Sequence, residues 1–262
     1  MTDPFDLHNR TALVTGASRG IGARIAETLA GRGAQVLCAG RDAEALDRVV
    51  AAIQHAGGQA KPLTADLSDR DEVVELASAA GAVDILVNNA GTGDKYIPLT
   101  AADDAHWDTT FAVNFFAPML LTREVGRGMA ERGRGSILNI SSIAGQWAMP
   151  LMGAYTCAKA ALESLTRMTA LELGPRGVRC NTIAPGVVVT ELSASFLTGP
   201  VLDFFQSQTP LGRLGSVDEV ANVALFLASD ASSYLNGQTI TLDGGTLAGN
   251  TPLSAALAAL RG

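Results

Sequence analysis

Cysteine and histidine are scarce in this sequence, and their scatter argues against a metal centre. The 262 residues include three cysteines and three histidines, and neither set has the spacing of a metal-ligand motif. They are Cys38, Cys157, Cys180, His8, His55 and His106. An odd number of scattered cysteines indicates reduced thiols in a cytosolic protein. We therefore expect no metal site, and a structural or surface role for each histidine.

Positive charge is also low. Lysine and arginine number 19 against 26 acidic residues, which gives a net charge of −7 and a sequence pI of about 4.9. This balance disfavours a nucleic-acid-binding face and an anionic membrane surface, because both require basic patches. Residues 1–9 lack the apolar core of a signal peptide, and no uncharged apolar run is long enough to span a membrane. The expected location is the cytoplasm, and the expected partner is a small molecule.

What the sequence does contain is a regular alternation of apolar strand-like runs and helix-period segments. Hydrophobic residues make up 47%, which suits one large globular domain over residues 1–262. The expected strands are 11–15, 35–39, 59–64, 84–87, 135–140, 178–183 and 239–242. The expected helices are 21–31, 43–56, 69–80 with Ser68 as its cap, 103–132 with a bend near Pro118, 151–173 and 217–228. This order predicts an α/β fold, a Rossmann-type doubly wound parallel sheet of about seven strands with helices on both faces.

A glycine-rich turn follows the first expected strand. It reads Thr15-Gly16-Ala17-Ser18-Arg19-Gly20-Ile21-Gly22 and leads into the first expected helix. Glycines permit a tight turn and close backbone approach, and a helix N-terminus offers free N–H groups to a pyrophosphate. Because the turn lies between a strand and a helix, it predicts a dinucleotide-binding loop.

A tyrosine and a lysine four residues apart share one face of the expected helix 151–173. They are Tyr155 and Lys159, and Ser142 lies upstream just after an expected strand. An ammonium beside a phenol lowers the phenol pKa from about 10, and a serine hydroxyl can hydrogen-bond a polarised oxygen. Taken alone, the pair favours a packed tyrosine and a solvated lysine, and the rest of the chain decides between the two interpretations.

Together these motifs make the chain resemble the short-chain dehydrogenase/reductase family, from Arg10 to Gly245. The residues that carry the resemblance are the T-G-x-x-x-G-x-G turn, Asn88-Asn89-Ala90-Gly91, Asn114, Ser142, Tyr155, Lys159, Pro185-Gly186, Thr190 and Asp243-Gly244-Gly245. The segment 12–33 is most similar to 3-oxoacyl carrier-protein reductases and to gluconate and sugar-alcohol dehydrogenases.

The resemblance implies a catalytic role for four residues. Tyr155 would be the general acid or base, and Lys159 would lower its pKa and bind the nicotinamide ribose. Ser142 would orient the reacting oxygen, and Asn114 would hold a water in a proton relay, unless its amide only satisfies a helix kink. The implied cofactor contacts are Gly16, Ser18, Arg19, Gly20, Ile21, Gly22, Arg41, Asp66, Leu67, Asn89, Ala90, Gly91, Tyr155, Lys159, Pro185, Gly186, Val188 and Thr190.

The residues after the second expected strand bear on the choice of dinucleotide. The tip reads Gly40-Arg41-Asp42, so the position where NAD-specific relatives carry an acid holds glycine, with arginine next. An arginine can bind a 2′-phosphate bidentately, and Arg19 could add a second cation. We therefore favour NADP(H). NAD(H) remains possible if Asp42, about twenty residues beyond Gly22, is the ribose-binding acid.

Three stretches should face the substrate: 92–97, 144–152 and a lid over 191–208. Gln146, Trp147 and Met149 are the expected substrate contacts, although apolar residues of these stretches could instead pack the lid or a subunit interface. Apolar lid residues favour a relatively apolar ketone or secondary alcohol, and a sugar or sugar acid could bind through Lys95, Gln146 and Ser193. The tail 246–262 is either an interface helix or a frayed end. The family resemblance implies a homotetramer.

The leading functional hypothesis is an NADP(H)-dependent carbonyl reductase or alcohol dehydrogenase. One alternative is an NAD-dependent sugar or sugar-acid dehydrogenase. Another is a non-catalytic dinucleotide-binding sensor, which would have no need of the four catalytic residues. An epimerase or dehydratase would require a different glycine spacing and a larger C-terminal domain.

Overall fold

A single parallel sheet organises the computed structural model, which describes residues 3–93, 96–194 and 197–249. Its strands lie in the order β3-β2-β1-β4-β5-β6-β9, and every neighbouring pair is parallel. Their bounds are β1 Thr11–Thr15, β2 Gln35–Gly40, β3 Gln59–Thr64, β4 Ile85–Asn88, β5 Gly135–Ile140, β6 Val178–Pro185 and β9 Thr239–Leu242. A short second sheet pairs β7 Val188–Val189 with β8 Gly215–Ser216. The predicted doubly wound sheet of about seven strands is confirmed.

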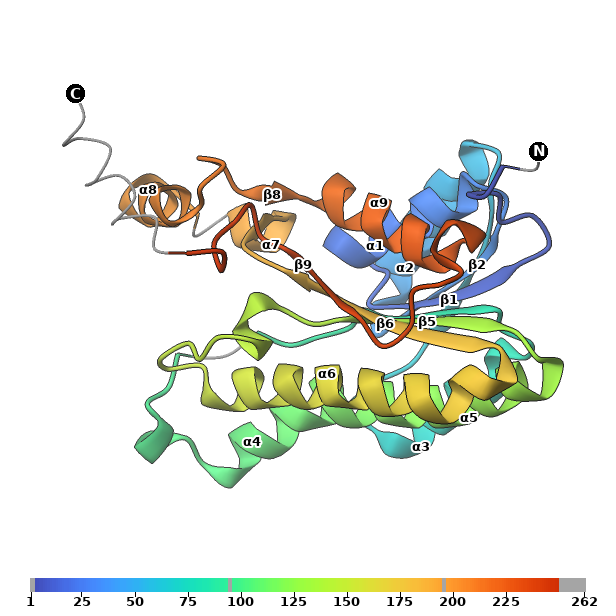
Figure 1. The fold of residues 1–262 in the computed structure, drawn as a ribbon, viewed down its shortest axis with the longest axis horizontal. Coiled ribbons are helices and arrows are strands. Elements are labelled where there is room, and N and C mark those ends of the chain that lie inside the picture. Colours follow the sequence, from blue (N-terminus) through green and yellow to red (C-terminus); the bar gives the residue numbers. More distant parts are fainter. Residues whose placement is uncertain (1–2, 94–95, 195–196, 250–262) are drawn as a thin grey trace.

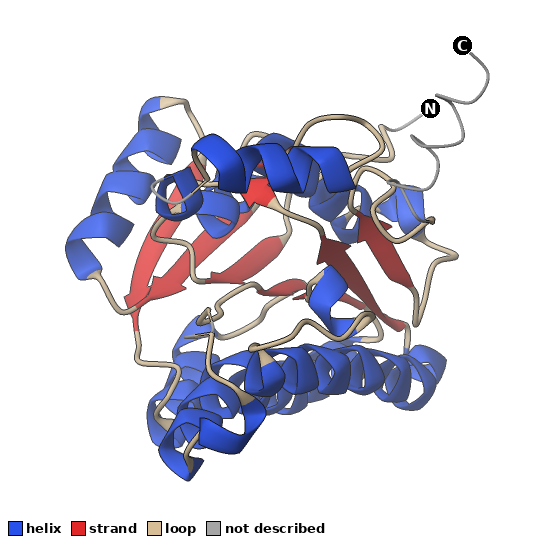
Figure 2. Ribbon diagram, turned by 90° about the vertical axis from the view of Figure 1, so that its left-hand side faces the viewer, coloured by secondary structure: helices blue, strands red, loops and turns tan. Residues whose placement is uncertain are grey.

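Helices cover both faces of this sheet (Figures 1 and 2). One face carries α1 Gly20–Ala30, α2 Ala43–His55 and α9 Val217–Ala228. The other carries α3 Arg70–Ala80, α4 Asp104–Phe111, α5 Ala117–Arg132 and α6 Gly153–Leu173. The remaining helices are α7 Glu191–Ala194 and α8 Gly199–Gln208.

Strand alternation divides the core between these two layers. In β1, Val14 packs in the cluster under α1 and α9, whereas the neighbouring Leu13 packs in the cluster that contains Leu121 and Met129 of α5. All four side chains are fully or almost fully buried. A strand buried on both faces needs apolar residues at every position, which explains its continuous apolar sequence.

The strand order reverses between β1 and β4, since β2 and β3 lie on one side of β1, and β4, β5, β6 and β9 lie on the other. In a doubly wound sheet, ligands bind in the crevice at the carboxyl ends of the strands at such a switch point. The glycine-rich turn follows β1, and Asn89 follows β4, so both lie at this crevice.

The expected single helix over 103–132 is two helices joined by a π-helical segment, Ala112–Phe116. Pro118 has no N–H, so it leaves the backbone carbonyl of Asn114 without its α-helical donor. The Asn114 side chain also donates from Nδ2 to the Thr110 carbonyl at 2.9 Å. The irregularity therefore centres on Asn114, four residues before the proline that we expected to mark a bend.

The cap of α3 also differs from the expectation, because Asp69 rather than Ser68 is the N-cap residue. The Asp69 carboxylate accepts hydrogen bonds from the backbone N–H groups of Asp71 and Glu72 at 2.8 and 3.3 Å. Ser68 instead donates to the side chain of Asp66 at 2.8 Å. Sequence alone could not separate two adjacent residues that are both good caps.

We expect Asp69→Ala to lower the free energy of unfolding by about 1 kcal/mol, since it leaves the first turn of α3 without its acceptor. Ser68→Ala should change it by less than about 0.5 kcal/mol, as exposed substitutions away from caps do. Urea unfolding of the two variants beside the parent measures both values. Equal losses would contradict the assignment of the cap to Asp69.

Candidate active site

The turn between β1 and α1 forms the floor of the crevice at the switch point. Gly16 and Gly20 have positive φ angles of 64° and 58°, a region that other residues rarely adopt. A Cβ at Gly22 would lie 2.2 Å from the Gly16 carbonyl oxygen and 2.4 Å from Asn89 Nδ2. Asn89 Nδ2 donates to the Thr15 carbonyl at 2.9 Å, so it ties the end of β4 to this turn. The turn can therefore pack this closely against the start of α1 and the end of β4 only because residue 22 is glycine.

The N-terminus of α1 is available to bind an anion. Arg19 is the N-cap residue in an extended conformation, and its side chain makes no capping hydrogen bond. The first N–H groups of the helix therefore have no side-chain acceptor, and the helix dipole is positive at this end. Free N–H groups beside a glycine-rich turn fit the pyrophosphate of a dinucleotide.

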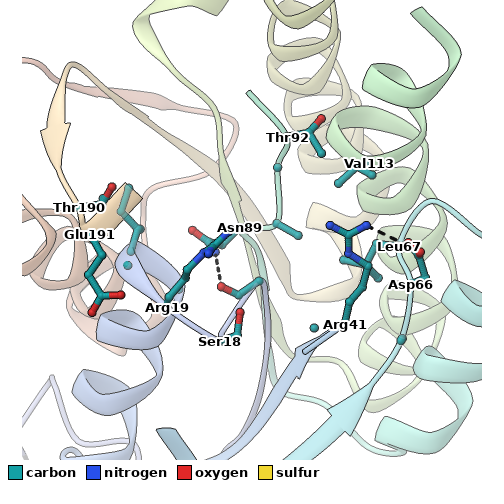
Figure 3. A pocket seen from close by; sticks show the side chains of 18 residues that line it. Ser18, Arg19, Arg41, Asp66, Leu67, Asn89, Thr92, Val113, Thr190 and Glu191 are labelled. Carbon is teal, nitrogen blue, oxygen red and sulfur yellow. Dashed lines mark hydrogen bonds and ion pairs between the residues drawn. The ribbon is translucent and has the colours of Figure 1, made fainter. Parts of the chain in front are cut away.

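A cavity of about 260 Å³ lies over this turn (Figure 3). Its lining includes most of the predicted cofactor contacts from the first half of the chain, together with residues from the start of α7. The lining residues are Gly16, Ser18, Arg19, Gly20, Ile21, Gly22, Gly40, Arg41, Ala65, Asp66, Leu67, Asn89, Ala90, Gly91, Thr92, Val113, Thr190 and Glu191.

Arg41 and Asp66 face each other across one end of this cavity (Figure 3). Arg41 Nη1 lies 3.9 Å from an Asp66 carboxylate oxygen, and 68% of the Arg41 side chain is exposed. The pKa of Asp66 is lowered mainly by hydrogen bonds from Ser68 and further by the charge of Arg41. Asp42, the alternative ribose acid, instead caps α2 by accepting from the N–H of Ala45 at 3.0 Å. Arg41 thus lines the dinucleotide cavity, whereas the Asp42 carboxylate is engaged by α2 and does not line it.

A second cavity, of about 320 Å³, adjoins the first and contains the predicted reactive residues. Ser142, Tyr155 and Lys159 line it, and it shares Ile21, Asn89, Gly91, Thr92 and Thr190 with the dinucleotide cavity. Its other lining residues are Gly93, Ile140, Ser141, Pro185, Gly186 and Val188. The sequence-predicted residues from five separate segments are therefore gathered in one continuous cleft.

The Ser142 hydroxyl is oriented by its own backbone turn. Its oxygen accepts a hydrogen bond from the N–H of Ala144 at 3.1 Å, so the hydroxyl hydrogen points to another acceptor. Ser142 also hydrogen-bonds the side chain of Tyr155, an interaction that lowers the tyrosine pKa. The two hydroxyls therefore lie close enough to contact one reacting oxygen together.

Burial dominates the ionisation of the tyrosine and the lysine. Burial raises the pKa of Tyr155 above its usual value of 10, despite the hydrogen bond with Ser142. It also lowers the pKa of Lys159 to about 8. Lys159 Nζ donates to the Ile140 carbonyl at 2.9 Å and lies 5.5 Å from the centre of the Tyr155 ring. The expected lowering of the tyrosine pKa by Lys159 is therefore not what the structure gives, because removing the phenolate from water has the larger effect.

The π-helical segment places Asn114 beside Lys159. Asn114 is fully buried, and its Nδ2 donates to the backbone and side-chain oxygens of Thr92 at 3.2 and 3.1 Å. Its Oδ1 has no hydrogen-bond partner among the residues that the structure describes. A Cβ at Gly91 would lie 2.9 Å from this oxygen and 3.5 Å from Lys159 Nζ, so both polar atoms border the same small space. A buried oxygen in that position can accept a hydrogen bond from a water next to the lysine.

The predicted substrate residues do not line either cavity. Gln146 is hydrogen-bonded at both ends of its amide, to Glu163 and to Thr241, and Trp147 is 55% exposed. Met149 is half-buried outside both linings. Ser193 is engaged with the Val188 carbonyl and with Thr190. Substrate contact by this group stays a prediction.

The lid also stays a prediction. None of the described residues of α8 lines either cavity, and Phe204 is 58% exposed. Lys95, Phe196 and residues 250–262 of the tail lie outside the described residues.

Sequence reasoning did not name four residues of the cleft: Ala65, Val113, Ile140 and Ser141. Three of them directly precede Asp66, Asn114 or Ser142, so proximity to these motif residues was the available signal. Thr92 and Gly93 of the expected stretch 92–97, and Glu191 at the start of the expected lid, do line the cleft. In the described part of the chain no cluster of three or more histidine, cysteine, aspartate or glutamate side chains could hold a metal ion.

Gly22→Ala should lower dinucleotide affinity by at least about 10-fold, because the added methyl overlaps the Gly16 carbonyl and such overpacking costs about 1–3 kcal/mol. Gly128→Ala is the matched control. Its Cβ would lie 3.1 Å from the mobile end of Arg132, and alanine is favoured over glycine within α5 by about 0.5–1 kcal/mol. Fluorescence titration with NADPH measures the affinities, and an unchanged value for Gly22→Ala would contradict the close-approach role of this glycine.

The sheet order, the glycine-rich turn and the adjoining cavities define a Rossmann-type dinucleotide-binding oxidoreductase. A family profile described as enoyl-(acyl carrier protein) reductase matches residues 16–246. The chain belongs to the short-chain dehydrogenase/reductase family. It is therefore an NAD(P)-dependent oxidoreductase of the family that acts on CH–OH groups.

Characterised relatives match almost the whole chain. Gluconate 5-dehydrogenase of Gluconobacter oxydans is 39% identical over 93% of this chain and 96% of its own length. The 7α-hydroxysteroid dehydrogenase of Escherichia coli is 38% identical over 93% and 96%. The crystal structure of a proposed NAD(P)-dependent gluconate 5-dehydrogenase from Beutenbergia cavernae, with NADP bound, superposes with a TM-score of 0.90 at 37% identity, over 94% of this chain and 100% of that one.

Proposed function

We propose that this chain is an NADP(H)-dependent carbonyl reductase or alcohol dehydrogenase in which Tyr155 is the general acid and base. The observation that carries the proposal is the position of Ser142, Tyr155 and Lys159 in a cavity continuous with the dinucleotide cavity. The nicotinamide, when bound, donates or accepts the hydride. The residues of the chain supply the proton and hold the reacting oxygen.

In the reductive direction Tyr155 donates its hydroxyl proton to the ketone oxygen. A phenol with a raised pKa is protonated at neutral pH, which is the form that this step requires. When substrate is bound, Ser142 donates its hydroxyl hydrogen to the same oxygen and so holds it beside the tyrosine. Lys159 and Asn114 return a proton to the tyrosine through a water in the space beside Gly91.

The dinucleotide is held along the switch-point crevice. The turn from Gly16 to Gly22 and the N-terminus of α1 bind the pyrophosphate. Arg41, with Arg19 nearby, binds the 2′-phosphate of NADP(H), and Asp66 accepts from the adenine amino group. Pro185, Gly186, Val188 and Thr190 lie at the nicotinamide end.

The substrate is a ketone or secondary alcohol, and the relatives span a wide range of polarity. Their names include dehydrogenases of gluconate, threitol, galactitol, cis-4-hydroxycyclohexanecarboxylate and a 7α-hydroxysteroid. Apolar residues exposed in the stretch between Ser142 and Tyr155, Trp147 at 55% and Leu151 at 46%, favour the less polar members. A polyol or sugar acid is the second candidate, favoured by the gluconate and threitol relatives.

Initial rates test this proposal directly. Oxidation of the five named alcohols is measured with NADP⁺ and with NAD⁺, each cofactor at low micromolar concentration. Reduction of the matching ketones is measured with NADPH and with NADH. We expect turnover of at least one substrate, a preference for NADP(H), and higher rates with the cyclohexane and steroid alcohols than with the polyols. Binding of NADPH without turnover of any substrate would instead support a sensor.

The proposed assembly is a homotetramer in the cytoplasm. A groove between α5 and α6 is lined by apolar side chains, including Met119, Leu165 and Met168, and by charged side chains around them. Leu171 of α6 is 79% exposed. Helix faces of this kind pack against a second copy. All three cysteines are free thiols, which suits a reducing compartment. Among the described helices none is apolar over the length that a membrane span needs. Light scattering measures the assembly, with a mass of about four chains expected.

A further inference from the structure

Glu163 is a buried carboxylate behind the catalytic cavity, and the proposed chemistry does not use it. It lies on α6 one helical turn after Lys159 and is 7% exposed. Its Oε1 accepts a hydrogen bond from Ser141 Oγ at 3.0 Å and a longer one from Gln146 Nε2 at 3.5 Å. A buried carboxylate is costly unless such donors satisfy it, so its presence here requires an explanation.

Both of its partners flank Ser142 in sequence. Ser141 immediately precedes Ser142, and Gln146 is the residue that ends the short 3₁₀ turn Ile143–Gly145. Ser141 Oγ also lies 3.3 Å from the Lys159 carbonyl oxygen. One carboxylate thus holds the chain on both sides of Ser142 and joins it to the turn of α6 that carries Lys159.

The turn itself packs directly on α6. A Cβ at Gly145 would lie 3.0 Å from Glu163 Oε1, from the Lys159 carbonyl carbon and from Ser141 Oγ. The backbone can therefore approach the helix this closely only because residue 145 is glycine.

The other end of Gln146 is anchored to the sheet. Thr241 of β9 donates from Oγ1 to Gln146 Oε1 at 3.0 Å. A series of hydrogen bonds thus connects α6 to the edge strand β9 by way of the 3₁₀ turn. It runs from Glu163 through Gln146 to Thr241, and Ser141 binds the same carboxylate. Both ends of the Gln146 amide are therefore occupied, and this side chain ties the turn to α6 and to β9.

We propose that Glu163 is a positioning residue that fixes the Ser142 hydroxyl relative to Tyr155. This inference rests on the proposed roles of Ser142 and Tyr155. Without the carboxylate, Ser141 and Gln146 lose their common acceptor, and the turn can move away from α6. Displacement of an oriented catalytic group by about 1 Å can cost up to about 100-fold in rate.

A double-mutant cycle with Ser142 tests the proposal. We expect Glu163→Ala to lower kcat by about 10- to 100-fold, measured with NADPH and the best ketone of the panel. In the Ser142→Ala background the same change should cost less than about 3-fold, because the group that it positions is already gone. An equal loss in both backgrounds would overturn the proposal, since a general loss of structure is indifferent to Ser142.

Two further variants separate the hydrogen bonds from charge and from unfolding. Glu163→Gln keeps an acceptor oxygen for Ser141 and should retain kcat within about 3-fold of the parent. A loss as large as that of Glu163→Ala would contradict positioning by hydrogen bonds. Glu75→Ala, an exposed glutamate of α3, is the matched control and should change nothing. The NADPH affinity of all variants should stay within about 2-fold, which verifies folding.

A spectroscopic readout needs no substrate. The chain has three tyrosines, so ¹³Cζ-tyrosine labelling gives three resolvable signals, and Tyr155→Phe identifies the one from Tyr155. At pH 7, Glu163→Ala and Ser142→Ala should each shift this signal, and the double variant should match Ser142→Ala alone. If Tyr155→Phe keeps full activity, the proposed function fails. If Tyr155→Phe is inactive and the Tyr155 signal is unmoved by Glu163→Ala, only the positioning role fails.

Discussion

Tyr155→Phe is expected to lower kcat for ketone reduction by about 10²- to 10⁴-fold, the usual contribution of a positioned general acid. The variant keeps the ring, which packs beside Lys159, and loses only the hydroxyl that faces Ser142. NADPH affinity should therefore stay within about 2-fold. Steady-state rates with the best ketone of the panel, combined with NADPH titration, measure both quantities.

Tyr234→Phe is the matched control for this experiment. Tyr234 is fully exposed and lines neither cavity, so loss of its hydroxyl should leave kcat unchanged. The kcat of Ser142→Ala should lie between those of Tyr155→Phe and Tyr234→Phe, because this change removes an oxygen contact and leaves the acid in place. A Tyr155→Phe enzyme with parental kcat would refute the assignment of the acid.

Arg41→Ala is expected to raise the KM for NADPH by about 10- to 100-fold and to leave the KM for NADH within about 2-fold. A charge-assisted hydrogen bond to a phosphate contributes about 1.5–3 kcal/mol, and only NADP(H) carries the 2′-phosphate. The guanidinium is available for that role, since its nearest carboxylate, Asp66, is 3.9 Å away. The ratio of the two kcat/KM values is the measurement.

Arg48→Ala controls for general positive charge. Arg48 is exposed on α2 and borders a neighbouring cleft with Arg41, but it does not line the dinucleotide cavity. Arg48→Ala should change kcat/KM for NADPH and for NADH equally, and by less than about 2-fold. Arg41 does not select the phosphate if Arg41→Ala lowers kcat/KM equally with NADPH and NADH. A strong preference of the parent for NADH would show the same.

The sheet and its switch point were predictable from sequence because each buried strand is a short apolar run bounded by turn residues. The strand 135–140 and the helix 217–228 have the predicted bounds in the structure. The π-helical segment was not predictable, because it depends on two effects that act together, the missing N–H of Pro118 and the Asn114 side chain that takes the Thr110 carbonyl. Local periodicity records neither of them.

The gathering of the cleft residues followed from the rule that parallel strands end at one edge of the sheet. The ionisation of Tyr155 did not follow, because spacing indicates which charges are near but not how much water is lost. The hydrogen bonds of Gln146 could not be predicted from the sequence either. Its partner Thr241 is 95 residues away in sequence, and only the register of β9 beside β6 brings them together.

The lining of the two cavities spans the chain from Gly16 to Glu191, and β9 closes the sheet only near residue 242. A ribosome therefore completes almost the whole polypeptide before any dinucleotide can find its full set of contacts. The β1-α1 turn is synthesised early, before the strands that complete the site. The cofactor therefore binds the complete fold and not the partly synthesised chain. Because a ligand that binds only the folded state stabilises it, the cellular dinucleotide concentration contributes to the stability of the finished protein.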